Sequence, residues 1–248
     1  MQKNRTKDAV RDLPPLTAIH QVLVLRTSKT ETGRLYVMSV NHQTILRVDS
    51  SMRHGGSISR LLADATVSEL HKNLSNSTVL LRDLTAGVGH VSSAWREARI
   101  EAPKSRSAED RALLAQSEAL GAEAEGADII VLAVPIYNFS IPAALKAWVD
   151  MVCRNNVDGA TAQTKPSPKK PKHAIVLLTS NHTLAGANDD FASEFLKFIL
   201  IFIGCTEINV VDATGLANDK ASVLANAHEK IRSICQAVAS HEIYAAAE

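Results

Sequence analysis

From residue 44 onward, short runs of β-branched and other apolar residues alternate with longer stretches of helical periodicity. The runs predict strands over Thr44–Asp49, Thr78–Asp83, Asp128–Val134, Ala174–Leu178 and Glu207–Val211. The longer stretches predict helices over Ile58–Lys72, Ala108–Glu125, Pro142 to about Arg154, Asp189–Ile203 and Asp219 to about Ser240. Strands that alternate with helices are typical of a parallel sheet. The pattern therefore predicts an α/β fold: a doubly wound five-stranded parallel sheet in a three-layer sandwich.

Two segments fall outside this pattern. Residues 1–37 carry seven basic and three acidic residues and precede the first strand. We expect them to form an N-terminal extension, either poorly packed or foreign to the native product, in which Gln21–Arg26 and Leu35–Val40 are able to pair as a hairpin. The folded domain then spans residues 38–248. Lys165–Lys172 holds three prolines and four lysines, which predicts an exposed loop.

Composition narrows the class of partner. The 248 residues include 27 Lys and Arg against 26 Asp and Glu, a net charge of +1, so nothing global attracts this chain to nucleic acid or to an anionic membrane. No apolar run approaches the roughly 18 residues of a membrane helix, and the polar N-terminus lacks the apolar stretch of a signal peptide. Cys153, Cys205 and Cys235 lie far apart in apolar segments, as reduced thiols do. We expect a cytoplasmic protein with a small-molecule partner.

The loop after the first predicted strand has the composition of an anion site. Ligands of open parallel sheets bind beyond the carboxyl ends of the strands. This serine loop, Ser50–Ser59 (SSMRHGGSIS), offers the hydroxyls of Ser50, Ser51, Ser57 and Ser59 and the free N–H groups of a helix that begins at Ile58. Such groups favour a phosphate. The alternative is a helix capped by Ser57 with no ligand.

The loop after the central strand is the most specific stretch in the chain. In this aromatic loop, Pro135–Pro142 (PIYNFSIP), two prolines bracket Asn138, which is flanked by Tyr137 and Phe139. We interpret it as a rigid turn that presents backbone amides and ring faces at the sheet edge. The alternative is that the two aromatic side chains are ordinary core residues.

These stretches resemble a known family. PIYNFSIPAALKAWVD, LKFILIFIGCTEINVV, the serines of the serine loop and RDL at Arg82–Leu84 are similar to the FMN-dependent NADH:quinone reductase and azoreductase family. Its members are flavodoxin-like enzymes, some once called acyl-carrier-protein phosphodiesterases. The resemblance runs from about Thr44 to Val238.

The resemblance implies a site and a reaction. It implies a non-covalent FMN, with NADH or NADPH as electron donor and a quinone or azo compound as acceptor, in ping-pong two-electron hydride transfer. It implies a homodimer, and no catalytic side chain beyond the flavin. The residues that it implies for FMN are, for the phosphate, Ser51, Ser57, Ile58 and Ser59; for the ring, Ile136, Tyr137, Asn138 and Phe139; and for the far side, Thr179, Ser180, Asn181 and His182.

The sequence departs from the family pattern in two places. Asn181 and His182 stand where the family usually has paired glycines, and Asn155–Pro171 lacks the aromatic residues that commonly cover the substrate pocket. If the backbone at His182 needs positive φ, that residue is strained. An alternative function is therefore a flavodoxin-like binding or regulatory module with weak or lost flavin binding. A phosphodiester hydrolase would need a metal or nucleophile that the sequence does not display.

Other polar residues suggest structural roles. His90 falls in a predicted loop over Val88–Pro103, and Asp49 is placed for strand-end pairing with Arg82 or Arg47. Asp189 and Asp190 are expected to begin a helix rather than to bind metal. That helix is apolar around nearly its whole circumference, more than packing on one face of a sheet requires. We therefore expect a homodimer that buries part of this helix or of the helix that starts at Pro142.

Overall fold

The computed structural model describes residues 25–29, 35–39, 42–153 and 172–245, and the side chains of residues 42–153 and 172–240. The chain divides into two compact units, Met1–Val40 and Asn41–Glu248. In the first, β1 (Leu25–Lys29) pairs antiparallel with β2 (Leu35–Ser39), as the expected hairpin. The first strand runs three residues past its predicted end at Arg26, and residues 21–24 lie outside the described part.

The second unit contains the predicted parallel sheet. Its strands are β3 (Gln43–Asp49), β4 (Ser77–Asp83), β5 (Ile129–Pro135), β6 (His173–Thr179) and β7 (Glu207–Ala213). Their order is β4-β3-β5-β6-β7, and every pair is parallel. All residues of β5 and β6 are buried, because the sheet has helices on both faces. The five-stranded doubly wound sheet is therefore confirmed.

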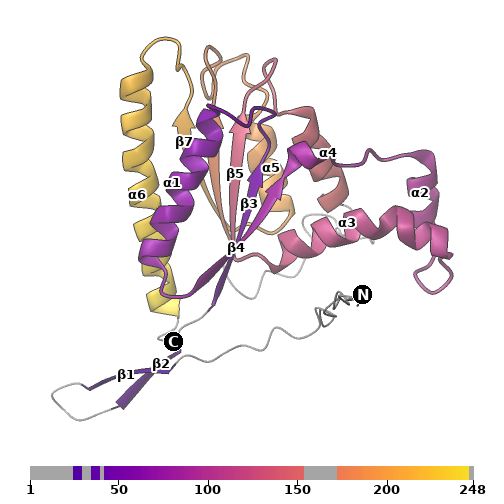
Figure 1. The fold of residues 1–248 in the computed structure, drawn as a ribbon, viewed down its shortest axis with the longest axis horizontal. Helices are drawn as coiled ribbons and strands as arrows, with labels where there is room; N and C mark the ends of the chain where they lie inside the picture. Colours follow the sequence, from indigo (N-terminus) through magenta and orange to yellow (C-terminus); the bar gives the residue numbers. More distant parts are fainter. Residues whose placement is uncertain (1–24, 30–34, 40–41, 154–171, 246–248) are drawn as a thin grey trace, which may run out of the picture. The chain divides into compact units, whose positions relative to one another are not determined.

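Helices cover both faces of this sheet. They are α1 (Ile58–Asn73), α2 (Ser93–Ile100), α3 (Ala108–Gly126), α4 (Ala143–Val152), α5 (Ser193–Phe202) and α6 (Lys220–Ala245), with a 3-10 turn at Leu84–Ala86. Figure 1 shows α1 and α6 on one side of the sheet and α3, α4 and α5 on the other. Two separate apolar cores fill the spaces between these layers, one on each face. The three-layer sandwich is confirmed.

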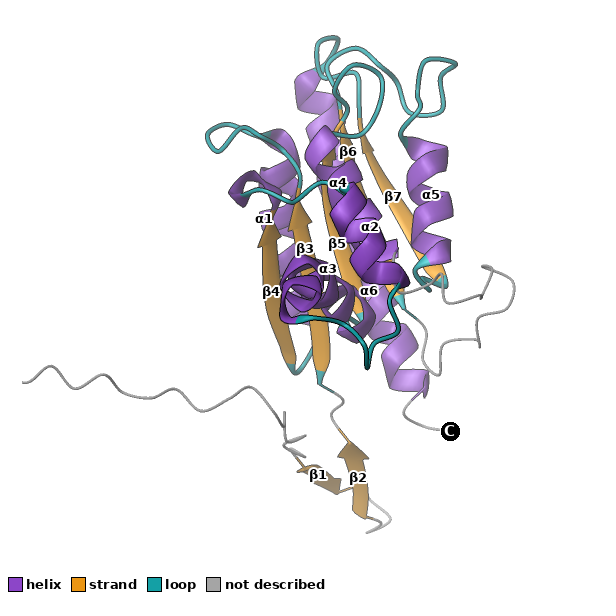
Figure 2. Cartoon of the chain, turned by 90° about the vertical axis from the view of Figure 1, so that its right-hand side faces the viewer, coloured by secondary structure: helices purple, strands orange, loops and turns teal. Residues whose placement is uncertain are grey.

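The helical predictions were wrong in two places. The predicted loop Val88–Pro103 contains α2, whose Trp95 and Ala98 enter the core, and Figure 2 shows this short helix beside α3. The helix predicted from Asp189 begins instead at Ser193. Asp190 precedes that helix and accepts hydrogen bonds from the backbone N–H groups of Ala192 and Ser193 at 2.9 and 3.0 Å.

Two predictions fall on residues outside the described part. These are the Lys/Pro loop, of which only Lys172 is described, and the segment Asn155–Pro171, where the pocket cover was expected to be absent. The helix predicted from Pro142 to about Arg154 is observed as α4, which ends at Val152.

The division into two units predicts the effect of a truncation. We expect deletion of residues 1–40 to leave the melting temperature and the far-UV circular dichroism of the remaining chain nearly unchanged, because the sheet begins at Gln43 and its two cores are built from later residues. Thermal melts of the full chain and of residues 41–248 test this. A fall of more than about 5 °C, equivalent to roughly 1–2 kcal/mol, would show that the extension is part of the fold.

Candidate functional site

Three loops meet at one edge of the sheet because β3, β5 and β6 are parallel neighbours. The backbone N–H and the hydroxyl of Ser50 both donate to the carbonyl of Ala133 at the end of β5, at 3.1 and 2.7 Å. The N–H of Ile136 donates to the carbonyl of Thr179 at the end of β6, at 2.8 Å. The chain passes from β3 to β4 on one side and then crosses back to β5 on the other side of β3. The strand order therefore reverses at β3. Such switch points hold ligands in doubly wound sheets.

The serine loop brings buried hydroxyls to the start of α1. Ser51, Ser57 and Ser59 are all buried, and the hydroxyl oxygens of Ser57 and Ser59 lie 3.2 Å apart. Ser57 occupies the N-cap position of α1, as the capped-helix alternative expects, but its hydroxyl makes no cap hydrogen bond. Those hydroxyls therefore remain directed to each other at a helix start.

Two other helices of this chain show what an ordinary serine cap looks like. The hydroxyl of Ser92 accepts from the N–H of Trp95 at the start of α2, at 3.1 Å, and Ser107 forms a reciprocal capping box with Asp110 on α3. The first turn of α1 has no such cap and no acidic residue. Its N–H groups and the helix dipole favour an anion.

The aromatic loop forms a tight turn with an unusual backbone. Tyr137 and Ser140 exchange two backbone hydrogen bonds, at 2.9 and 3.2 Å, around Asn138 and Phe139. These two central residues have φ of 48° and 70°, the pattern of a type I′ turn. Positive φ is strained for phenylalanine, at a cost of about 1–3 kcal/mol, and such strain clusters at functional sites. The side chain of Phe139 is exposed, so the ordinary-core alternative is wrong for it.

Tyr137 joins the aromatic loop to the serine loop. Its hydroxyl lies 3.2 Å from the hydroxyl of Ser51. The ring is half-buried, and its hydroxyl faces the serine loop. The two loops are therefore coupled by a side-chain contact as well as by the pairing of β3 with β5.

The third loop, Thr179–His182, carries no backbone strain. Thr179 and Ser180 are buried, and the Ser180 hydroxyl donates to the carbonyl of Thr183. Asn181 and His182 are exposed, and neither has positive φ. The strain considered for His182 is therefore absent from this loop.

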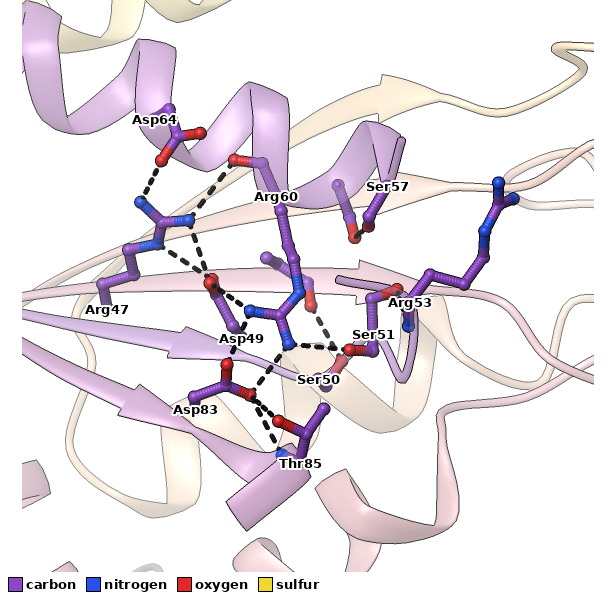
Figure 3. A network of polar contacts seen from close by, with 12 residues as sticks. Arg47, Asp49, Ser50, Ser51, Arg53, Ser57, Arg60, Asp64, Asp83 and Thr85 are labelled. Atoms are coloured by element: carbon purple, nitrogen blue, oxygen red, sulfur yellow. Dashed lines mark hydrogen bonds and ion pairs between the residues drawn. The ribbon is translucent and has the colours of Figure 1, made fainter. Parts of the chain in front are cut away.

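A network of charged side chains supports the serine loop from below (Figure 3). The guanidinium of Arg60, on the first turn of α1, contacts the carboxylates of Asp49 and Asp83 and the carbonyl of Ser51. Asp49 also pairs with Arg47, as one of the two sequence alternatives proposed. The other alternative was wrong, because Arg82 pairs with Glu123 of α3, on the opposite face of the sheet.

The network shifts the ionisation of its members in the direction that keeps them charged. Hydrogen bonds from Arg60, and then from the backbone and hydroxyl of Thr85, hold the pKa of Asp83 well below its ordinary value. The hydrogen bonds that Arg60 donates to Asp83 raise the pKa of Arg60 above its ordinary value. Burial alone would lower the pKa of Arg47, but its bonds to Asp49 and Asp64 outweigh burial and raise it.

A surface hollow of about 480 Å³ lies elsewhere, along α1. It is lined by Arg47, Asp64, Val67, Ser68, His71 and Lys72 and includes none of the residues predicted to bind a ligand. His90 is exposed in its loop. The sheet edge, rather than this hollow, gathers the residues with unusual geometry.

Known proteins are similar to this chain in sequence and in fold. A model of the flavodoxin-like fold matches residues 43–235. FMN-dependent NADH:quinone oxidoreductase 1 of Colwellia psychrerythraea is 37% identical over 77% of this chain and 99% of its own length. The chain belongs to the flavodoxin-like family. Its similarity to a relative of the same name from Jannaschia sp. is also 37%, over 77% of this chain and 97% of that protein.

Solved structures agree with this flavodoxin-like assignment. An azoreductase from Bacillus anthracis str. Sterne superposes with a TM-score of 0.68 at 20% identity, covering 78% of this chain and 99% of that one. An FMN-dependent NADH-azoreductase from Bacillus anthracis str. Ames Ancestor, solved in complex with FMN, gives a TM-score of 0.67 at 18% identity, over 80% and 100% of the two chains. These likenesses establish the fold.

The described part of the flavodoxin-like chain lacks features of two other protein classes. Within residues 42–153 and 172–240, no three His, Cys, Asp or Glu side chains are grouped to hold a metal ion. Nor is any described helix both long and apolar enough to cross a membrane.

The low pKa of Asp83 predicts an acid-dependent stability. Folding favours the charged carboxylate, so its contribution is complete above the ordinary pKa of 3.8 and is lost as pH falls from there toward the lower folded value. We expect Asp83→Asn to lower the free energy of unfolding by about 1 kcal/mol or more at pH 7. The deficit should persist to about pH 5 and shrink below about pH 4.

Urea unfolding at a series of pH values measures this difference. Asp150→Asn is a matched control, because Asp150 is an exposed carboxylate that pairs with Lys146 one turn earlier on α4. A deficit for Asp83→Asn that is the same at pH 3 as at pH 7 would contradict the role assigned to its charge.

Proposed function

We propose that this chain is an FMN-dependent oxidoreductase that takes a hydride from NADH or NADPH and reduces quinones or azo compounds by two electrons. The observation that carries the proposal is the start of α1, where buried serine hydroxyls and uncapped N–H groups lie beside the strained aromatic turn. The names of the 37% identical relatives support the same reaction.

The three loops divide the work of holding FMN. The residues proposed to bind it are, at the phosphate, Ser51, Ser57, Ile58 and Ser59; at the ring, Ile136, Tyr137, Asn138 and Phe139; and on the far side, Thr179, Ser180, Asn181 and His182. The donor set fits the group, because a dianionic phosphate suits hydroxyls and helix N–H groups that have no acidic neighbour in that turn. The strained turn keeps its amides fixed at the sheet edge.

The protein's part in the reaction is to bind and orient. When bound, FMN would supply the capacity to accept a hydride and pass on two electrons. Backbone N–H groups of the aromatic and third loops would donate hydrogen bonds to the polar end of the ring, where negative charge develops. Phe139 would cover apolar surface of the ring and exclude water there. Because the flavin would supply the hydride chemistry, no side-chain acid or base is required.

Flavin content tests this function directly. We expect the purified full chain to be yellow, with about one FMN per chain, or to become so when FMN is added. A colourless protein that gains no flavin absorbance would favour the alternative, a binding or regulatory module without flavin. Because the third loop is unstrained, the structure removes one reason for that alternative.

Replacing two hydroxyls tests the phosphate cradle. Ser57→Ala with Ser59→Ala removes two donors to a charged acceptor, each worth about 1.5–3 kcal/mol, so FMN affinity should fall at least tenfold. Ser92→Ala is the matched control, because it removes a serine from the start of α2 and should cost only helix-cap stability, about 1 kcal/mol. Equal dissociation constants for the double variant and the wild type would reduce the loop to a helix start.

We also propose a homodimer that buries the outer face of α5. Phe198 and Ile201 lie one turn apart on this helix and are 63% and 61% exposed, and Phe191 just before it is 65% exposed. Exposed apolar groups of this size mark interaction surfaces. The outer face of α4 instead carries the ion pair Lys146–Asp150, so α5 is the better candidate of the two helices.

Light scattering at micromolar concentration tests the assembly. The wild type should have the mass of a dimer, and Phe198→Glu with Ile201→Glu should have the mass of a monomer. Leu61→Glu is the control, because Leu61 is similarly exposed, at 55%, but lies on α1 on the other face of the sheet. A monomeric wild type would contradict the dimer.

A cytoplasmic location is proposed on the chemistry of the thiols. Cys205 and Cys235 are free thiols. Burial raises the pKa of Cys205 and of Cys235 to about 12, so neither is poised to react. Unpaired, unreactive thiols suit a reducing compartment.

A further inference from the structure

We propose that Arg60 is a positioning residue that holds the serine loop in its phosphate-binding shape, and so sets the preference for a phosphorylated flavin over an unphosphorylated one. This inference rests on the proposed function and concerns the same site. It assigns a role to a side chain that does not itself reach the ligand.

Arg60 stands where three elements must be held together. Asp49 ends β3 and Asp83 ends β4, and the two are direct partners in the parallel register of these strands. The guanidinium of Arg60 lies between their carboxylates, at 3.0 Å from Asp49 and 2.8 Å from Asp83. Its side chain is only 12% exposed, and that of Asp49 only 2%. The first turn of α1 is thereby fastened to the ends of both strands.

The same guanidinium fixes the backbone of the serine loop. Its Nη2 donates to the carbonyl of Ser51 at 2.8 Å, and Ser51 is the residue whose hydroxyl meets Tyr137. Figure 3 shows Arg60 reaching from α1 to Ser51 and Asp83. Arg60 thus sets the distance between the two halves of the loop, Ser51 at its beginning and the Ser57–Ser59 pair at its end.

The donors on both Nη atoms of Arg60 are already occupied, so neither Nη is available to a phosphate in this arrangement. Nη1 donates to Asp49 and Asp83, and Nη2 donates to Ser51 and Asp83. The remaining donor, Nε, is buried and has no hydrogen-bond partner in the described part of the chain. Arg60 would have to give up a bond to a carboxylate or to the carbonyl of Ser51 before either Nη could bind a ligand.

The charge of the network gives a second reason for a geometric role. Arg47 and Arg60 face Asp49, Asp64 and Asp83, so two guanidiniums meet three carboxylates and the network is net negative. It therefore supplies no net attraction for a phosphate. Attraction must come from the serine loop itself, whose hydroxyls and N–H groups bind with a strength that depends on their positions. Holding the loop in shape is then what Arg60 contributes.

Two substitutions separate geometry from charge. Arg60→Lys keeps the positive charge, but a single ammonium cannot reproduce the planar fork that bonds two carboxylates and a carbonyl. Arg60→Met removes both charge and fork. The matched control is Arg82→Met, which breaks the ion pair with Glu123 on the opposite face of β4 and touches no part of the serine loop.

The measurement is the dissociation constant of the flavin-free full chain for FMN and for riboflavin, which lacks the phosphate. We expect the wild type to prefer FMN. Both Arg60 variants should lose FMN affinity at least tenfold while riboflavin affinity stays within about twofold, so the preference falls at least tenfold. Arg82→Met should lower the melting temperature and leave the preference unchanged.

Several outcomes would overturn the inference. If Arg60→Lys keeps the wild-type preference, charge rather than geometry is responsible. If both variants lose the two flavins equally, or keep both, Arg60 has no specific role at the loop. If the wild type binds neither flavin, the proposed function fails, and thermal stabilisation by inorganic phosphate becomes the test: it should appear in the wild type and disappear in Arg60→Lys, and any other result overturns the role of Arg60.

Discussion

Parallel pairing of β3 with both β4 and β5 is the constraint on which the rest of the site depends. It brings the carboxyl ends of these strands to one edge and places Asp49 directly beside Asp83. Two neighbouring carboxylates repel each other and, when buried, must be compensated by a cation. Arg60 compensates both carboxylates. It can do so because α1 begins a short loop after β3, so its first turn lies at the ends of β3 and β4. The polar cluster and the loop above it are therefore consequences of a single strand register.

Burial of these charges is costly, and their retention needs a reason. Breaking a buried ion pair by removing one partner costs about 3–5 kcal/mol, whereas an apolar replacement of the whole cluster is often neutral. An apolar cluster, however, would leave the carbonyl of Ser51 without its hydrogen bond from Arg60. We interpret the network as a device for specifying one loop geometry rather than for adding stability.

The sequence sufficed for the sheet and failed where structure depends on distant partners. The β-branched runs predicted all five strands within about two residues. In β5 and β6 the reason is burial on both faces, which leaves a continuous apolar pattern. Helix α2, which is only eight residues long and buries only Trp95 and Ala98, was missed. Asp190 was expected to begin a helix because negative charge suits a helix N-terminus. Its carboxylate does accept from a helix-start N–H group, but that group belongs to Ser193, three residues further on. The role of Arg60 was hidden, although two predicted strands that both end in Asp could have signalled a shared cation.

The aromatic turn shows how the fold holds a strained element in place. Positive φ at Asn138 and Phe139 would relax in an isolated peptide, but the turn is fixed at both ends and at its centre. Tyr137 and Ser140 close it, and the carbonyl of Phe139 accepts the N–H of Phe191, which immediately precedes the α5 region. The backbones of Phe139 and Phe191 are thus tied together, and their exposed side chains lie one on the proposed flavin loop and one on the proposed dimer face. Ligand binding would bury the side chain of Phe139, and subunit contact would bury that of Phe191. Because a hydrogen bond joins their backbones, both events are expected to stabilise the same turn.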